Sequence, residues 1–70
     1  MTKEEVLKAI EETGLIQDID LKGIDLSGAD LSESSFLRVN LSESLFNNAK
    51  LSSVHLSACD ISGAVFKDAD

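Results

Sequence analysis

Residues 19–70 read IDLKG-IDLSG-ADLSE-SSFLR-VNLSE-SLFNN-AKLSS-VHLSA-CDISG-AVFKD-AD when they are divided into units of five. The middle position of each complete unit holds a large apolar residue: Leu21, Leu26, Leu31, Phe36, Leu41, Phe46, Leu51, Leu56, Ile61 and Phe66. The position two residues earlier is never charged and is mostly small. Because a repeat at fixed spacing determines the whole architecture, it is interpreted before any local feature.

A spacing of five residues fits neither a helix nor a straight strand. In an α-helix, positions five apart are rotated by roughly 140° and would spread around the whole surface. In a straight strand, an odd spacing places successive side chains on opposite faces. All the middle residues can face one interior only if the chain turns a corner in every unit. Repeated corners wind the chain into a solenoid, in which each repeat contacts mainly its neighbours.

The last two positions of each unit are rich in Ser, Gly, Asn and Asp, which are turn-forming residues. This pattern resembles the pentapeptide-repeat family, whose consensus is A(D/N)LXX, and Ala29–Glu33 (ADLSE) matches that consensus in full. The resemblance implies an all-β solenoid: a right-handed quadrilateral β-helix of about two and a half coils, with about twenty residues per coil. The period alone does not distinguish three sides from four.

With four sides, residues twenty apart stack on one another. The inner columns are then predicted to be Leu21–Leu41–Ile61, Leu26–Phe46–Phe66, Leu31–Leu51 and Phe36–Leu56. Two departures from the family pattern carry further expectations. Ile19 and Ile24 are larger than the family's usual residue at the small inward position, so the first coil is expected to be distorted or widened. Leu45 and Val65 are apolar where the family prefers Asp or Asn.

Residues 1–14 have a different pattern and are predicted to form a short amphipathic α-helix that caps the solenoid of residues 15–70. Thr2 followed by Glu5 is a capping box. Val6 and Ile10 fall at helical spacing, and Gly14 suits a C-terminal stop. Because a solenoid exposes an apolar cross-section at each end, the helix is expected to cover Ile16, Ile19 or Leu21. The alternative is a partner-binding helix.

No equivalent cap follows the last repeats. Three explanations compete: a fragment of a longer repeat protein, end-to-end dimerisation through the last coil, or a frayed end. Truncation or dimerisation is favoured, because uncovered apolar edges invite association. The resemblance adds weight to dimerisation, because members of the family are often dimers through their C-terminal ends.

Composition narrows the classes of partner. The net charge of −7 disfavours direct binding of nucleic acid or of an anionic membrane surface. The chain has a single Cys, no long apolar stretch and no signal-peptide pattern, so a cytoplasmic protein is expected. The expected partner is another protein or a second copy of the chain, with no cofactor.

No catalytic or metal-binding residue is predicted. His55 should lie above Ser35, but no carboxylate or oxyanion hole completes a triad. Cys59 points inward while His55 points outward, so their spacing does not suit a zinc site, which needs about four ligands. Asp20, Asp25, Asp30 and Asp60 lack the nonapeptide pattern of calcium-binding solenoids. Because the predicted solenoid has a filled interior and no cleft, an enzyme is not expected.

Two functions remain, and they predict different surfaces. The first is a structural or protein-interaction module that docks through apolar residues, with Leu37, Leu45, Val65 and Phe66 as candidates. The second follows from the resemblance, because some pentapeptide-repeat proteins are acidic rods that mimic duplex DNA and bind type II topoisomerases. Its candidate surface is formed by Asp20, Asp25, Asp30 and Asp60. A rod of about 12 Å would need dimerisation or a longer chain to mimic one DNA turn of about 34 Å.

Overall fold

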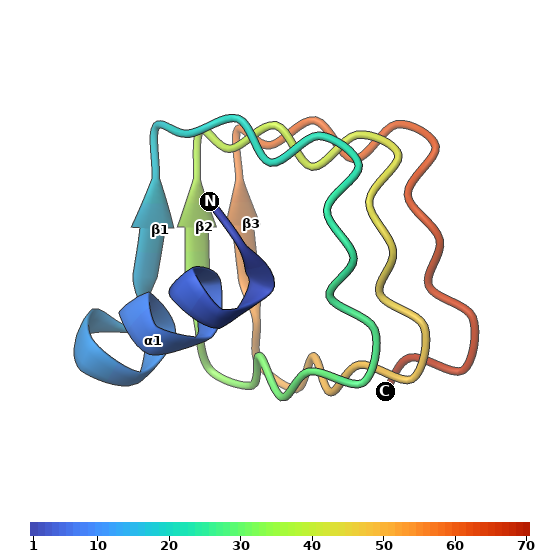
Figure 1. Ribbon diagram of the computed structural model, residues 1–70, viewed down its shortest axis with the longest axis horizontal. Coiled ribbons are helices and arrows are strands. Elements are labelled where there is room, and N and C mark those ends of the chain that lie inside the picture. Colours follow the sequence, from blue (N-terminus) through green and yellow to red (C-terminus); the bar gives the residue numbers. More distant parts are fainter.

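The computed structural model describes all residues, Met1–Asp70, and contains one helix and one parallel sheet. The elements are α1 (Lys3–Thr13), β1 (Leu15–Gln17), β2 (Ser35–Leu37) and β3 (His55–Ser57). The sheet order is β1-β2-β3, so strands that are neighbours in space are twenty residues apart in the chain. Figure 1 shows the three strands on one side of a chain that winds repeatedly around a common interior.

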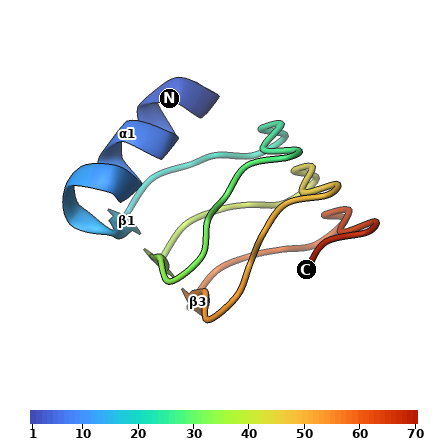
Figure 2. The same cartoon turned by 90° about the horizontal axis from the view of Figure 1, so that it is seen from below.

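Helix α1 begins and ends where the sequence predicts. The Thr2 hydroxyl accepts a hydrogen bond from the amide of Glu5, and the Glu5 carboxylate accepts one from the amide of Thr2, which completes the capping box. Gly14 ends the helix in the left-handed region at φ 75°, and its amide donates to the Ile10 carbonyl. Val6 is fully buried in the core, so α1 covers one end of the solenoid, as Figure 2 shows.

The chain has four sides, because four sets of residues pair at an offset of twenty. β1, β2 and β3 form the strand side, where Leu15 pairs with Ser35 and Ser35 with His55. The other three sides are named after their first paired residue. They are the Asp20 side (Asp20, Asn40, Asp60), the Asp25 side (Asp25, Leu45, Val65) and the Asp30 side (Asp30, Lys50). We call residues 15–34, 35–54 and 55–70 the first, second and third rungs. The predicted solenoid is confirmed.

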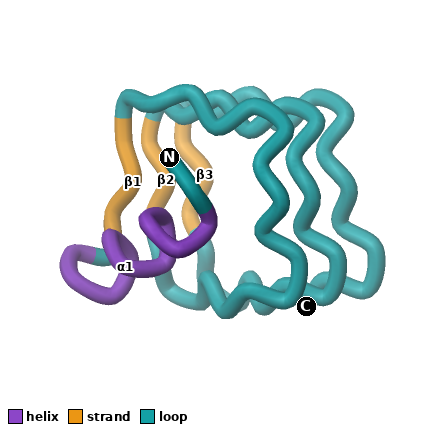
Figure 3. The backbone as a smooth tube through the Cα atoms, in the orientation of Figure 1, coloured by secondary structure: helices purple, strands orange, loops and turns teal.

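Regular strands occur on the strand side alone, whereas the other three sides pair through isolated bridges (Figure 3). On those sides a β-turn begins at the middle residue of the unit. For example, the Ile24 amide donates to the Leu21 carbonyl at 3.1 Å. Because this turn takes up most of a five-residue unit, only an isolated bridge precedes it. On the strand side no such turn follows Ile16, Phe36 or Leu56.

The corners share one backbone conformation. Every fifth residue from Asp18 to Asp68 has a positive φ: Asp18, Gly23, Gly28, Glu33, Arg38, Glu43, Asn48, Ser53, Ala58, Gly63 and Asp68. Most of these residues are not glycine, although the left-handed region is unfavourable for a residue with a Cβ atom. The geometry of the corner therefore overrides the local preference of the residue that occupies it.

The middle residues form the core, which is closed at one end and open at the other. Leu26, Leu31 and Leu41 are fully buried. In the third rung the equivalent positions are uncovered, with exposed fractions of 40% for Leu56, 43% for Ile61 and 37% for Phe66. The predicted stacking of Phe66 on Phe46 is confirmed, since their ring centroids are 5.0 Å apart.

The expected distortion of the first rung does not appear in its pairing. Ile19 and Ile24 are half-buried and pack against the core. Their neighbours Asp20 and Asp25 still pair at the regular offset with Asn40 and Leu45. The larger side chains are thus accommodated without loss of the pairing between the first and second rungs.

Candidate functional site

The four acidic residues predicted as a surface stabilise the corners of the coil. The Oδ1 atoms of Asp20, Asp25, Asp30 and Asp60 each accept a hydrogen bond from the backbone amide two residues later, at 2.9, 3.0, 3.1 and 2.9 Å. Asn40 does the same with the amide of Ser42. An Asp or Asn side chain that binds its own backbone in this way is an Asx-turn.

For Asp25, Asp30 and Asp60, hydrogen bonds from the serine two residues later favour the ionised carboxylate. The hydroxyl and then the backbone amide of Ser27 hold the pKa of Asp25 below its ordinary value. Ser32 lowers the pKa of Asp30 in the same way, and Ser62 lowers that of Asp60. The Asp-Leu-Ser sequences at residues 25–27 and 30–32 are therefore explained by turn geometry, without any ligand.

The structure does not gather the four carboxylates into one surface. Asp20 and Asp60 lie on one side, two rungs apart, with the uncharged Asn40 between them. Asp25 and Asp30 lie on the other two sides that lack regular strands. Asp30 pairs with Lys50, which interrupts the negative charge of its column. The acidic candidates are thus distributed around the coil.

The apolar candidates fall into three separate places. Leu45 and Val65 stack on the Asp25 side, as predicted from their spacing, and Val65 is 40% exposed. Leu37 lies in β2 on the strand side, which faces away from the Asp25 side. Phe66 points into the solenoid and is exposed only because no rung covers it. Only Leu45 and Val65 therefore share a surface.

Phe66 belongs to a larger apolar surface, which we call the open end and define as Leu56, Ile61 and Phe66. All three residues occupy the middle position of their units, and all are more than a third exposed. Leu56 and Ile61 were not among the residues predicted to mediate interaction. The signal was present in the sequence, since the same position of the repeat places all three at one cross-section.

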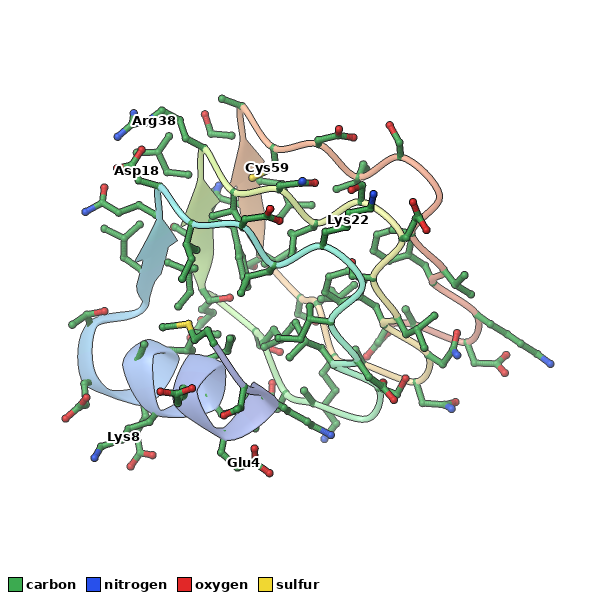
Figure 4. All side chains as sticks on the ribbon, turned by 45° about the horizontal axis from the view of Figure 1, so that its top comes forward. Glu4, Lys8, Asp18, Lys22, Arg38 and Cys59 are labelled. Carbon is green, nitrogen blue, oxygen red and sulfur yellow. The ribbon has the colours of Figure 1, made fainter.

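An ion pair on the strand side was also missed. The Arg38 guanidinium donates to both carboxylate oxygens of Asp18, with Nε–Oδ1 and Nη2–Oδ2 distances of 2.5 and 3.0 Å (Figure 4). The hydrogen bond from Arg38 holds the pKa of Asp18 below its ordinary value. The spacing of twenty residues between opposite charges could have predicted this pair once the four-sided coil was known.

The remaining polar candidates are His55 and Cys59, and their neighbours indicate a structural role. His55 lies beside Ser35 through strand pairing, as predicted. Cys59 points toward the second rung, and its Sγ donates to the Phe36 carbonyl at 3.3 Å (Figure 4). The structure contains no pocket and no group of three or more His, Cys, Asp or Glu side chains placed to hold a metal ion.

Comparison with known families supports the resemblance that the repeat suggests. A family model described as pentapeptide repeats (8 copies) matches residues 17–48. This segment is similar to pentapeptide repeats. The matched pentapeptide repeats span the first rung and most of the second, including Asp20, Asp25, Asp30 and Leu45. No curated protein matches the chain. The structure has no helix of sufficient length and apolar character to cross a bilayer.

Proposed function

We propose that this chain is a non-enzymatic protein-interaction module, which docks another protein or a second copy of itself through the open end of a rigid coil. In this proposal the coil is a right-handed quadrilateral β-helix of about two and a half coils, and the protein works in the cytoplasm. The observation that carries the proposal is the exposure of Leu56, Ile61 and Phe66, which are 40%, 43% and 37% exposed although their equivalents in the other rungs are mostly buried.

The two ends of the coil differ in a way that supports docking at one of them. At the first rung, α1 covers the core, and Ile16 and Leu21 are each only 3% exposed. At the open end, no helix covers the core (Figure 2). Covering the three exposed side chains removes apolar surface from water, which is the main driving force for association of proteins. A rigid coil also loses little conformational entropy when it binds.

The test is the association of the purified protein, measured by sedimentation equilibrium. We expect reversible self-association through the open end, and we expect Ile61→Asp to weaken it at least tenfold, because the change places a charge in the contact. Ser57→Asp is the matched control, since Ser57 is an exposed residue of the same rung that lies outside the open end. A strictly monomeric protein at the highest attainable concentration, or equal effects of the two variants, would contradict docking of a second copy at the open end.

The stacked pair Leu45 and Val65 offers a second, lateral docking surface. The double variant Leu45→Asp, Val65→Asp should weaken association and leave the thermal unfolding transition cooperative, since Val65 is 40% exposed. Unchanged association in this variant would remove the lateral surface and leave the open end as the remaining candidate.

The net charge of −7 favours a second function, mimicry of duplex DNA toward a DNA-handling enzyme such as a type II topoisomerase. A mimic should bind such an enzyme with strong salt dependence and compete with duplex DNA, whereas docking through apolar residues should be nearly independent of salt. The dispersal of Asp20, Asp25 and Asp30 over three sides favours the interaction module over the mimic.

A further inference from the structure

The hydrogen bonds between rungs have a direction. On the three sides without regular strands, each unit donates two amides to the following rung and one amide back. Leu21 donates to the Asn40 carbonyl at 2.8 Å and Gly23 donates to the Ser42 carbonyl at 2.9 Å, while Asn40 donates to the Ile19 carbonyl at 3.1 Å. The pattern is the same on the Asp25 and Asp30 sides. Each rung therefore has an amide-rich edge toward the next rung and a carbonyl-rich edge toward the previous one.

The amide-rich edge of the third rung is unpaired. In the second rung, Leu41 donates to the Asp60 carbonyl at 2.7 Å and Glu43 donates to the Ser62 carbonyl at 2.8 Å. The equivalent amides of Ile61 and Gly63 have no backbone acceptor in the chain. Backbone amides require partners when they are removed from water, so a protein that covers the open end must bring carbonyl groups in excess.

The opposite edge, on the first rung, is carbonyl-rich, and α1 partly replaces the missing amides. In the second rung, the Asn47 carbonyl accepts a hydrogen bond from the Gly28 amide at 2.8 Å. The equivalent carbonyl of the first rung is that of Ser27, and it accepts a hydrogen bond from Lys3 Nζ at 2.8 Å. A lysine of α1 thus takes the place of a backbone donor, while Val6 of α1 completes the core.

A second copy of the chain can meet the open end in two ways. If two open ends face each other, amide-rich edges meet, and only the apolar side chains fit. If the first rung of one copy follows the third rung of another, carbonyl-rich and amide-rich edges meet in the twenty-residue register that already joins the rungs. The head-to-tail arrangement pairs the free backbone amides with carbonyl groups. It is blocked by α1, which covers the first rung.

We propose that the open end is a head-to-tail docking surface for the first rung of a second copy, and that α1 is the cap that prevents this assembly. The proposal rests on the proposed function, since both use the open end, and it adds the direction and the chemistry of the partner edge. Intact copies then associate reversibly through a weak contact between open ends, whereas uncapped copies continue the ladder into rods.

The test releases α1 from the first rung by substitution, without shortening the chain. The double variant Lys3→Glu, Val6→Asp should release α1, because it reverses the charge that binds the Ser27 carbonyl and puts a carboxylate at a fully buried position. We expect elongated particles in sedimentation velocity, with a mean mass that rises with concentration. Lys8→Glu is the matched control, since Lys8 is an exposed residue of the same helix, and it should behave as the intact protein.

The intact protein provides a second readout. It should act as a chain stopper, so that a small fraction of intact protein shortens the rods, and Ile61→Asp added to the uncapped variant should abolish them. If the uncapped variant does not fold alone, it should still form a one-to-one complex with isotope-labelled intact protein. In that complex, the amides of Ile61 and Gly63 should become protected from hydrogen exchange.

Two results would overturn the proposal. The first is an uncapped variant that is folded and stays monomeric, and the second is an uncapped variant that forms neither rods nor a complex that protects the Ile61 amide. If the intact protein self-associates through Ile61 while the uncapped variant gives either result, docking at the open end stands and the head-to-tail direction is wrong. If Ile61→Asp affects no form of association, the proposed function itself fails.

Discussion

The ring of Phe66 lies parallel to that of Phe46, with the centroids 5.0 Å apart and an angle of 2° between the planes. The two residues occupy the same position of the repeat, twenty residues apart, yet Phe46 is 2% exposed and Phe66 is 37% exposed. The third rung covers Phe46, and nothing in the chain covers Phe66. The pair therefore shows how far one covering rung lowers the exposed fraction of the same side chain.

Truncation of these two rings should have unequal effects. Phe46→Ala should lower the free energy of unfolding by about 3–5 kcal/mol, as expected for a buried aromatic residue. Phe66→Ala should cost less, about 1–2 kcal/mol, because its ring is already partly in water. Urea denaturation of both variants followed by circular dichroism gives the comparison. Equal losses would mean that the third rung contributes no effective burial.

At the corners, glycine should favour the stability of the fold, whereas in the interior of an ordinary strand it is destabilising. Gly28 has φ 74°, and the position that a Cβ atom would take there has no neighbouring atom within 4 Å. Gly28→Ala should therefore destabilise through the backbone alone, by about 1 kcal/mol. Ala58, at φ 55°, is the reverse case. Ala58→Gly should leave stability unchanged or raise it by up to about 1 kcal/mol. Thermal unfolding of the two single variants distinguishes the signs, and a loss in both would contradict the strain argument.

Stability should fall in acid because of the Asx-turns. Asp25, Asp30 and Asp60 have folded pKa values below the unfolded value of 3.8. Their contribution is therefore fully present above this unfolded value and is lost as the pH falls through the lower folded values. Asn40 shows that an amide oxygen can serve the same turn, since its Oδ1 accepts from the Ser42 amide at 3.0 Å.

The measurement is the melting temperature between pH 7 and pH 2. The triple variant Asp25→Asn, Asp30→Asn, Asp60→Asn should lose less stability on acidification than the unmodified protein, because it keeps the acceptors and removes three titrating groups. Exposed Glu12→Gln is a control for the general effect of charge. An acid transition as steep in the triple variant as in the unmodified protein would show that other groups cause it.

The small inward position should tolerate Ala better than a larger residue. Ser44 is fully buried, and both its hydroxyl and its amide donate to the Leu41 carbonyl. Ser44→Ala leaves that carbonyl with its amide partner, so the free energy of unfolding should change by less than about 1 kcal/mol. Ser44→Val should cost about 1–3 kcal/mol through overpacking. Chemical denaturation should rank the variants in this order, and a larger loss for Ala would contradict it.

Much of the fold follows from one sequence pattern. The spacing of Leu21, Leu26 and Leu31 requires a corner in every unit, and the structure has one at each. Thr2, Glu5 and Gly14 define the helix through capping chemistry that is entirely local. The number of sides did not follow from the period, because five-residue units can close a coil in more than one way. The family resemblance supplied that number.

The site was harder to predict than the fold, because a surface depends on what covers each residue. Phe66 was predicted as an interaction residue, while Leu56 and Ile61, at the same position of the repeat, were not. The Asp residues suggested an acidic surface, yet their side chains face the backbone amides of their own turns. The polarity of the ladder has no sequence signal, since every residue but proline carries the same amide and carbonyl.

The position of a residue within its unit decides whether it faces the interior, and the unit decides on which side of the coil the residue lies. This distinction determines how the chain tolerates changes in length. Deleting five residues between Asp25 and Arg38 would return every downstream Leu, Ile and Phe to the interior, but it would carry each downstream outward residue a quarter of the way around the axis. Leu45 and Val65 would then no longer stand above Asp25, and Arg38 would no longer meet Asp18. Only gains or losses of twenty residues preserve both interior and exterior, so the lateral surfaces are a more sensitive record of insertions and deletions than the core.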